Sequence, residues 1–239
     1  MDIDLALMSG IDIPIPECQL ILHQPTIKEI AFIGEQDFFL GVQTIIVNKN
    51  MVLEDENLLD DINNFHIFMT IMAKDNEKKE AVRKVLQLTF PKYSISFLPR
   101  SLAFSTPEGI VAIDENNFEF IQQLFSLLFC LSSNSITQSS FNPADAKAAE
   151  IAKKLMRGRE RVAAQNGTSS VSVFSQYLSI LTVGLGSMSL EDCLNLTMYQ
   201  LFDLEKRYSL YLEWDIDLRA RLAGAKPDSQ PDNWMKNIH

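Results

Sequence analysis

Hydrophobic and polar positions in the first 131 residues follow strand and helix periods in turn. Residues 11–25 are rich in β-branched side chains and alternate in part, but Pro14 and Pro16 cannot donate a ladder hydrogen bond. This segment is therefore predicted to be an edge strand or an extended arm. Three short apolar runs, with Thr106–Gly109 as a turn, predict a small hairpin or sheet over 93–99, 101–105 and 110–113.

Helical periodicity accounts for the rest of this part of the chain. Thr26 and Glu29 form a T-x-x-E capping box, and the apolar positions that follow predict a helix carrying Ile27, Ile30, Phe38 and Val42 on one face. Further helices are predicted over 58–73, 76–90 and 118–131, the second closed by Pro91.

Residues 143–239 are predicted to be helical throughout. Asn142 and Pro143 suit the start of a helix over 144–165, which is rich in strong helix formers. An apolar stretch over 176–183 ends at Gly184 and Gly186, and Ser189 can cap a short helix. Thr197 and Gln200 form a second capping box for a long helix that ends at Gly224, with a 3–4 stripe of Leu201, Leu204, Tyr208, Tyr211, Leu218 and Leu222.

These patterns predict an α+β protein. Its mixed amino-terminal domain covers 1–131 and its helical carboxyl-terminal domain covers 143–239. Between them, residues 132–142 contain six Ser or Thr among eleven residues, a composition typical of a linker.

Charge is distributed unevenly over the 239 residues, whose net charge is −10. Residues 1–142 carry 19 acidic and 9 basic side chains, whereas residues 143–239 carry 12 of each. An acidic protein is repelled by phosphate backbones and anionic lipid, so neither nucleic acid nor a membrane is an expected partner. The most apolar run, 118–131, is too short to cross a bilayer.

Cysteine and histidine positions argue against a metal site. Cys18, Cys130 and Cys193 lie far apart, and His23, His66 and His239 never fall at ligand spacing, so neither zinc nor a disulfide framework is expected. Buried thiols and the acidic start favour the cytoplasm. On its apolar segment, His66 is expected to be a core or half-buried histidine, and His23 is expected to fasten a strand end.

Three further patterns resemble ligand sites only in part. Gly184 and Gly186 lack the third glycine or lysine of a phosphate-binding loop, which favours a helix-ending turn. The acidic clusters 54–56 and 60–61 lack the spacing of a calcium loop and favour a solvated loop. Basic residues near the middle of the chain have no interleaved aromatic side chains, so pairing with an acidic surface is favoured over nucleic acid: Lys153, Lys154, Arg157, Arg159 and Arg161. We identify no catalytic residues and no cofactor-binding residues, and we expect the protein not to be an enzyme.

Aromatic side chains concentrate late in the chain. Tyr208, Tyr211, Trp214 and Trp234 either anchor a partner protein or close the helical core of the carboxyl-terminal domain.

The last 46 residues resemble the end of bacteriophage tail-assembly proteins, above all the tail-assembly chaperones of phages that infect Gram-positive hosts. The matching positions form a helix start, a helix end and a closing W-M-K tail: Leu196, Thr197, Tyr199, Gln200, Leu201, Phe202, Asp203, Leu204, Arg207, Tyr208, Ala223, Gly224, Ala225 and Trp234–Lys236. The Pro-containing segment and T-x-x-E helix near the amino terminus resemble the opening of baseplate-hub assembly factors more loosely. Typical family members are shorter and mostly helical.

This resemblance implies a non-enzymatic role in virion morphogenesis in the host cytoplasm. The expected partners are tail proteins, namely tape-measure, tube or baseplate subunits, and a homo-oligomer is possible. The alternative is a structural component of the tail baseplate or hub that stays in the virion. In either role the residues expected to bind the partner are Tyr199, Phe202, Tyr208, Tyr211, Trp214 and Trp234.

Overall fold

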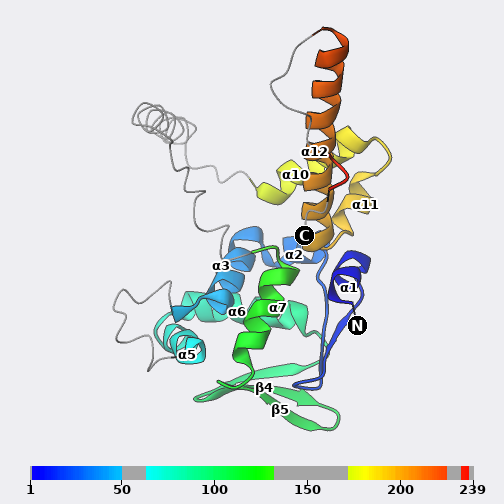
Figure 1. Ribbon diagram of the computed structural model, residues 1–239. Helices are drawn as coiled ribbons and strands as arrows, with labels where there is room; N and C mark the ends of the chain where they lie inside the picture. Colours follow the sequence, from blue (N-terminus) through cyan, green and yellow to red (C-terminus); the bar gives the residue numbers. More distant parts are fainter. Residues whose placement is uncertain (1, 50–62, 132–171, 225–232, 237–239) are drawn as a thin grey trace, which may run out of the picture.

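The computed structural model describes residues 2–49, 63–131, 172–224 and 233–236. A small antiparallel sheet lies at one end of the molecule, a layer of helices covers it, and the carboxyl-terminal helices lie at the other end, where α12 projects away (Figure 1). The predicted α+β class is confirmed, with strands in the amino-terminal part and helices in the carboxyl-terminal part.

The chain begins with a helix that the sequence analysis missed. Helix α1 (Ile3–Ser9) starts at Asp2, whose side chain accepts a hydrogen bond from the Leu5 amide, and it ends at Gly10 with φ of 69°. Seven residues are too few for a clear period, which explains why the pattern gave no signal.

The segment predicted to be one edge strand or arm is a hairpin. Strands β1 (Ile13–Ile15) and β2 (Leu20–Leu22) pair antiparallel, with Pro14 opposite Ile21. The tight turn has Gln19 at a φ of 53°. The prediction was wrong because it did not place a turn between two three-residue strands whose alternate side chains are both buried.

The first capping box is confirmed, but the helix that follows it is broken. Helix α2 (Ile27–Ile33) starts at Thr26, and helix α3 (Glu35–Ile46) follows after the single residue Gly34. Gly34 has φ of 89°, a left-handed conformation that glycine adopts without the steric cost of a Cβ. The prediction of one continuous helix from Ile27 to Val42 is therefore wrong at this one position.

The remaining amino-terminal elements follow the predictions closely. Helices α5 (Asn64–Lys74) and α6 (Asn76–Thr89) precede a three-stranded sheet of β3 (Ser94–Leu98), β4 (Ser101–Thr106) and β5 (Gly109–Ile113), and α7 (Phe118–Leu128) ends this part. The strand order is β3-β4-β5. Residues 58–62 of the predicted helix 58–73 lie outside the described residues, and α7 ends three residues before the expected position.

Three helices make up the described carboxyl-terminal part. They are α10 (Val173–Leu185), α11 (Leu190–Leu194) and α12 (Met198–Leu222), and the predicted caps Ser189 and Thr197 are confirmed. Gly186 ends α10, whereas Gly184, which was also expected to end it, lies inside the helix. The predicted linker 132–142, the helix 144–165 with its basic residues, and the acidic clusters 54–56 and 60–61 lie outside the described residues.

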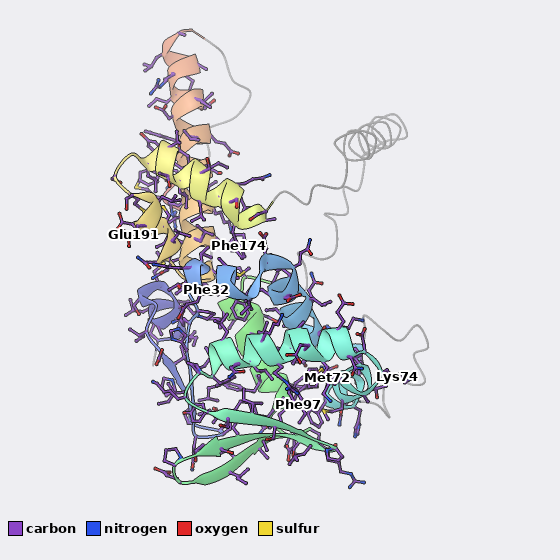
Figure 2. All side chains as sticks on the ribbon, turned by 180° about the vertical axis from the view of Figure 1, so that it is seen from behind. Phe32, Met72, Lys74, Phe97, Phe174 and Glu191 are labelled. Carbon is purple, nitrogen blue, oxygen red and sulfur yellow. The ribbon has the colours of Figure 1, made fainter. Side chains whose placement is uncertain are left out.

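Fully buried phenylalanines connect the layers. Phe104 on the sheet contacts Phe90, which in turn contacts Phe125 on α7. Phe125 contacts Phe129, just after α7, and Phe129 contacts Phe38 on α3. The ring-centre distances in this series are 5.0 to 6.4 Å. The series reaches α10 through Phe174, which stacks on Phe39 of α3 and lies where α10 meets the layer beneath it (Figure 2). Burying each phenylalanine contributes about 2–3 kcal/mol, so this core includes both parts of the chain.

Backbone contact joins the starts of α2 and α12. The Ile27 amide donates to the Leu196 carbonyl at 2.9 Å, and Thr26 and Thr197 form an isolated antiparallel bridge. The two predicted capping residues, 171 positions apart in sequence, therefore lie side by side.

Close approach of α3 and α6 yields a stability prediction. A Cβ at Gly41 would lie 2.5 Å from the Ala81 carbonyl oxygen, which belongs to a helix backbone and cannot move aside. We expect Gly41→Ala to lower the free energy of unfolding by about 1–3 kcal/mol, even though alanine favours helices by about 1 kcal/mol. Urea denaturation measures this change.

Gly184→Ala is the matched control. There the nearest atoms that the added Cβ would meet belong to the outer part of the Tyr208 ring, the far end of a side chain rather than a helix backbone. Its loss should be the smaller of the two, and a Gly41→Ala protein as stable as the parent would contradict the packing described for α3 and α6.

Candidate functional site

The six aromatic residues predicted to bind a partner lie on or against one helix, α12. The sequence builds this helix from a complete capping box: the Thr197 amide donates to Gln200 Oε1 at 2.8 Å, and the Gln200 amide donates to Thr197 Oγ1 at 3.3 Å. Gln200 also donates through Nε2 to the Met8 carbonyl of α1 at 2.8 Å. The first turn of α12 is therefore fixed to α1 and to the start of α2.

The first three turns of α12 are packed into the core. Tyr199 is 6% exposed, and burial raises the pKa of its phenol to about 12, with the Asp4 charge acting in the same direction. Phe202 is half-buried in an edge-to-face contact with Tyr177 of α10, at 5.3 Å between ring centres. Tyr208 is half-buried against Gly184, where the missing Cβ leaves room for the ring. These three residues hold α12 to the rest of the protein.

Beyond Tyr208 the character of α12 changes. Tyr211 and Trp214 meet Trp234 from the tail in a cluster with ring-centre distances of 5.6 to 6.4 Å. Tyr211 is 41% exposed, whereas Trp214 and Trp234 are half-buried. The structure therefore brings together three of the six predicted residues, and we call them the aromatic cluster.

Arg207 fixes the tail to the helix, a role that the sequence analysis missed. Its Nη1 donates to the carbonyl oxygens of Trp234 at 2.7 Å and Lys236 at 2.8 Å. Asn233 closes the turn by accepting a hydrogen bond from the Met235 amide at 3.0 Å. Arg207 precedes Tyr211 by four residues and Trp214 by seven, a spacing that places all three on one side of a helix and could have indicated this role.

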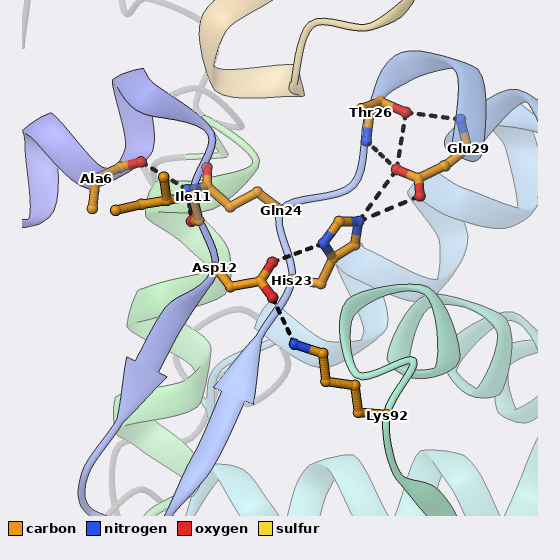
Figure 3. Close-up of polar contacts among 8 residues, drawn as sticks. All are labelled: Ala6, Ile11, Asp12, His23, Gln24, Thr26, Glu29 and Lys92. Carbon is orange, nitrogen blue, oxygen red and sulfur yellow. Dashed lines mark hydrogen bonds and ion pairs between the residues drawn. The ribbon is translucent and has the colours of Figure 1, made fainter.

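A second polar cluster surrounds His23 in the amino-terminal part (Figure 3). The two ring nitrogens face different carboxylates: Nδ1 lies 2.9 Å from Asp12 and Nε2 lies 3.3 Å from Glu29. Because ionised carboxylates only accept hydrogen bonds, the protonated imidazolium is the form that donates to both. The expected role of His23 at a strand end agrees with these contacts, since it connects the hairpin to the start of α2.

The pKa values of the two carboxyl groups in this cluster, Asp12 and Glu29, are lowered. Hydrogen bonds from His23 and Lys92, the latter at 3.0 Å, lower the pKa of Asp12. Burial alone would raise the pKa of Glu29, but hydrogen bonds from the Thr26 amide, the Thr26 hydroxyl and His23 outweigh it and lower that pKa. Both carboxylates therefore stabilise the fold in their ionised forms.

Other reactive side chains lie apart from these two clusters. His66 on α5 is exposed, and its Nε2 lies 3.8 Å from Glu115, so the expected core or half-buried position is wrong. Its polar ring occupies a solvent-facing position of an otherwise apolar helix. Cys18 and Cys193 are buried as expected, whereas Cys130 is exposed just after the end of α7.

A hollow of about 740 Å³ opens between the start of α3 and the start of α10. Its acidic rim residues are already engaged: Glu35 accepts a hydrogen bond from the Val173 amide at 2.8 Å, and Asp37 pairs with Lys84. Within the described ranges, no group of three or more His, Cys, Asp or Glu side chains gathers as metal ligands would. None of the described helices combines the length and apolar character that crossing a membrane requires.

Comparison with known proteins reaches the part of the chain that carries the aromatic cluster. Residues 167–239 match the family model of the YomV second domain, a phage-derived protein family. The match includes α10, α11, α12 and the tail, and it supports the phage origin that the sequence resemblance implied. The narrower assignment to tail-assembly chaperones stays a prediction. No curated protein and no solved structure matches the chain.

The carboxylates around His23 predict a loss of stability in acid. Because their pKa values are lowered in the folded state, their contribution is fully present above the ordinary carboxyl pKa and is lost as the pH falls below that value and through the lowered folded-state pKa. We expect the free energy of unfolding to drop between about pH 5 and pH 3, and to drop less in Glu29→Gln, which keeps the capping acceptor but does not titrate. Urea denaturation at several pH values in this range measures the free energy of unfolding of the parent and of Glu29→Gln. Glu108→Gln, in the exposed β4–β5 turn, is the control. Equal slopes in the parent and Glu29→Gln would contradict the assignment.

Removal of the Arg207 side chain should release the tail. The chain has two tryptophans, and both belong to the aromatic cluster, so intrinsic fluorescence reports on it directly. We expect Arg207→Ala to shift tryptophan emission to the red and to cost about 1–2 kcal/mol, with unchanged far-UV circular dichroism. Arg219→Ala, which changes another arginine of the same helix, should leave the emission spectrum as in the parent. An unshifted Arg207→Ala spectrum would show that the tail is held by other contacts.

Proposed function

We propose that the chain is a non-enzymatic assembly protein of a bacteriophage tail, and that it acts as a chaperone for the tape-measure protein or another tail component in the host cytoplasm. The observation that carries this proposal is the aromatic cluster on the projecting half of α12. Tyrosine and tryptophan supply large apolar contact area with a polar edge, and such residues dominate the binding energy of protein interfaces.

The position of the aromatic cluster supports a binding role over a purely structural one. Tyr199, Phe202 and Tyr208 hold α12 to the core, and Tyr211 and Trp214 lie beyond these contacts. Tyr211 is 41% exposed beyond that core, and Leu222 at the helix end is 80% exposed. A long helix that presents apolar side chains beyond its own domain suits the recognition of another helical polypeptide.

The match of residues 167–239 to a phage-derived domain family supports the phage origin that this proposal assumes. It covers the helix and the tail that form the aromatic cluster. The carboxyl-terminal sequence resemblance also concentrates there, since Thr197, Gln200 and Arg207 belong both to the matching positions and to the contacts that place the aromatic cluster.

A structural role in the baseplate or tail hub is the second proposal. In that role the segment 11–25, if it were a free edge strand, would add to the sheet of a neighbouring subunit. That segment is a closed hairpin, and the Ile21 amide already donates to the Tyr93 hydroxyl at 3.0 Å. Mass spectrometry of purified virions separates the two roles, because a chaperone would be absent or present in traces and a structural component would have a fixed copy number.

The chaperone proposal predicts a specific pattern of binding defects. We expect Trp214→Ala, Tyr211→Ala and truncation after Gly224, which removes Trp234, each to weaken binding to the purified tape-measure protein of the same phage by tenfold or more, about 1.4 kcal/mol or more. Biolayer interferometry at low protein concentration measures the affinity, and thermal unfolding shows whether each variant stays folded.

Phe32→Ala is the matched control. Phe32 on α2 is 84% exposed, so its removal deletes an aromatic side chain that is more accessible than those of the aromatic cluster and lies outside it (Figure 2). Full affinity in the folded Trp214→Ala and truncated proteins would refute the assignment of the binding surface.

A further inference from the structure

One side of α12 is covered by α10 only as far as Tyr208. Helix α10 contacts α12 from Tyr177, opposite Phe202, to Gly184, opposite Tyr208, and then ends at Gly186. Helix α12 continues for fourteen more residues, to Leu222. Figure 1 shows this half of α12 standing clear of α10 and α11.

The uncovered side continues the one that α10 occupies. At about 100° per residue, the side chains of Leu212, Asp215, Arg219 and Leu222 lie within about 40° of the direction of Tyr208. Leu212 is 37% exposed and Leu222 is 80% exposed, and Ile216 and Leu218 border them at 65% and 36%. We call Leu212, Asp215, Ile216, Leu218, Arg219 and Leu222 the distal seam. The aromatic cluster borders the distal seam, since Tyr211 is about 60° and Trp214 about 120° from Tyr208.

Charges on this half of α12 are ordered along its axis. Three acidic residues come first (Glu213, Asp215, Asp217), and two basic residues follow (Arg219, Arg221). Within the helix they form the i,i+4 pairs Asp215–Arg219 at 2.9 Å and Asp217–Arg221 at 2.6 Å. Arg219 is 77% exposed, and an ion pair with so exposed a partner contributes little to stability, so exchanging it for a pair between chains costs little.

We propose that the distal seam pairs antiparallel with the distal seam of a second copy of the chain. With a two-fold axis level with Asp217, Asp215 of each copy faces Arg219 of the other, and Leu212 faces Leu222. In a parallel pair in register, each acidic residue would face its own equivalent and each arginine would face an arginine. The order of charges therefore selects both the partner and its direction.

The space above α10 fits the same arrangement. In the antiparallel pair, Leu222 of the second copy lies level with Leu212, one turn above the residue where α10 contacts Tyr208. Gly224, with φ of 94°, ends the helical path of the second copy just there. The α12 helix of the second copy therefore lies along the distal seam, beyond the end of α10, and does not overlap with α10.

This contact is short, which sets its strength. A stable protein interface buries about 800 Å² on each partner, and half of one helix provides less than that. The dimer is therefore weak, with a dissociation constant in the micromolar range or above. It forms at the protein concentrations reached during assembly or on a shared scaffold. This inference does not depend on the proposed chaperone function, which uses the aromatic cluster.

Charge exchange at the distal seam tests the proposal. Sedimentation equilibrium of the full chain, from about 1 µM to 1 mM, should show a reversible monomer–dimer equilibrium. Asp215→Arg and Arg219→Asp should each weaken dimerisation at least tenfold, because like charges then face each other. The double variant Asp215→Arg with Arg219→Asp should restore it, because each new arginine faces a new aspartate.

Asp217→Arg is the matched control. It breaks the same kind of i,i+4 pair on the opposite side of the same helix, so its effect on helix stability is comparable while the distal seam is unchanged. It should dimerise like the parent. A monomer at every concentration, a dimer that Asp215→Arg leaves intact, or a double variant that fails to recover would each overturn the proposal. A tape-measure helix that occupies the distal seam of a chain that stays monomeric would overturn it as well.

Discussion

The position of α12 depends on one junction in the backbone, where the starts of α2 and α12 meet. Thr26 and Thr197 each begin a helix with a complete capping box, and the Ile27 amide donates to the Leu196 carbonyl between them. Each capping interaction contributes about 1 kcal/mol, but their adjacency matters more than their sum because it fixes where α12 begins and in which direction it leaves. Among the described residues, the core contacts of α12 lie within its first three turns, up to Tyr208, so the rest of this 25-residue helix projects beyond the core.

The extent of the core shows that the distal half of α12 lies outside it. Buried phenylalanines run from the sheet through α6, α7 and α3 to α10, and the apolar residues at the start of α12 complete this core. Among the described residues, Tyr211 and Trp214 beyond this core contact each other and the tail, which Arg207 holds through two carbonyl groups. The protein therefore separates a stable base from a presented surface, an arrangement that suits the recognition of other polypeptides.

Much of this architecture could be predicted from the sequence because the signals were local. The two capping boxes, the Ser189 cap and the turn at Thr106–Gly109 each depend on a few neighbouring residues, and all are confirmed. The failures depend on features that single-sequence periods do not contain. Gly34 breaks a helix whose apolar spacing continues across it, and the hairpin at 13–22 has strands too short to show a period. In the candidate site, the concentration of aromatic residues late in the chain indicated Tyr211, Trp214 and Trp234, which the structure brings together. The burial of Tyr199 and the contact of Arg207 with the tail depend on tertiary packing, although the spacing of Arg207 from Tyr211 and Trp214 was a local signal for the second. The division into domains at 131 and 143 stays a prediction.

Amide hydrogen exchange along α12, measured by mass spectrometry on the dilute protein, tests the central claim most directly. If the helix is held at its start and projects beyond Tyr208, amides of residues 201–208 will exchange only through global unfolding, and protection will fall steeply over residues 212–222 through local opening. Uniform protection along all of α12, equal to that of α3 and α6, would contradict the account, because it would mean that the distal half is packed as firmly as the core.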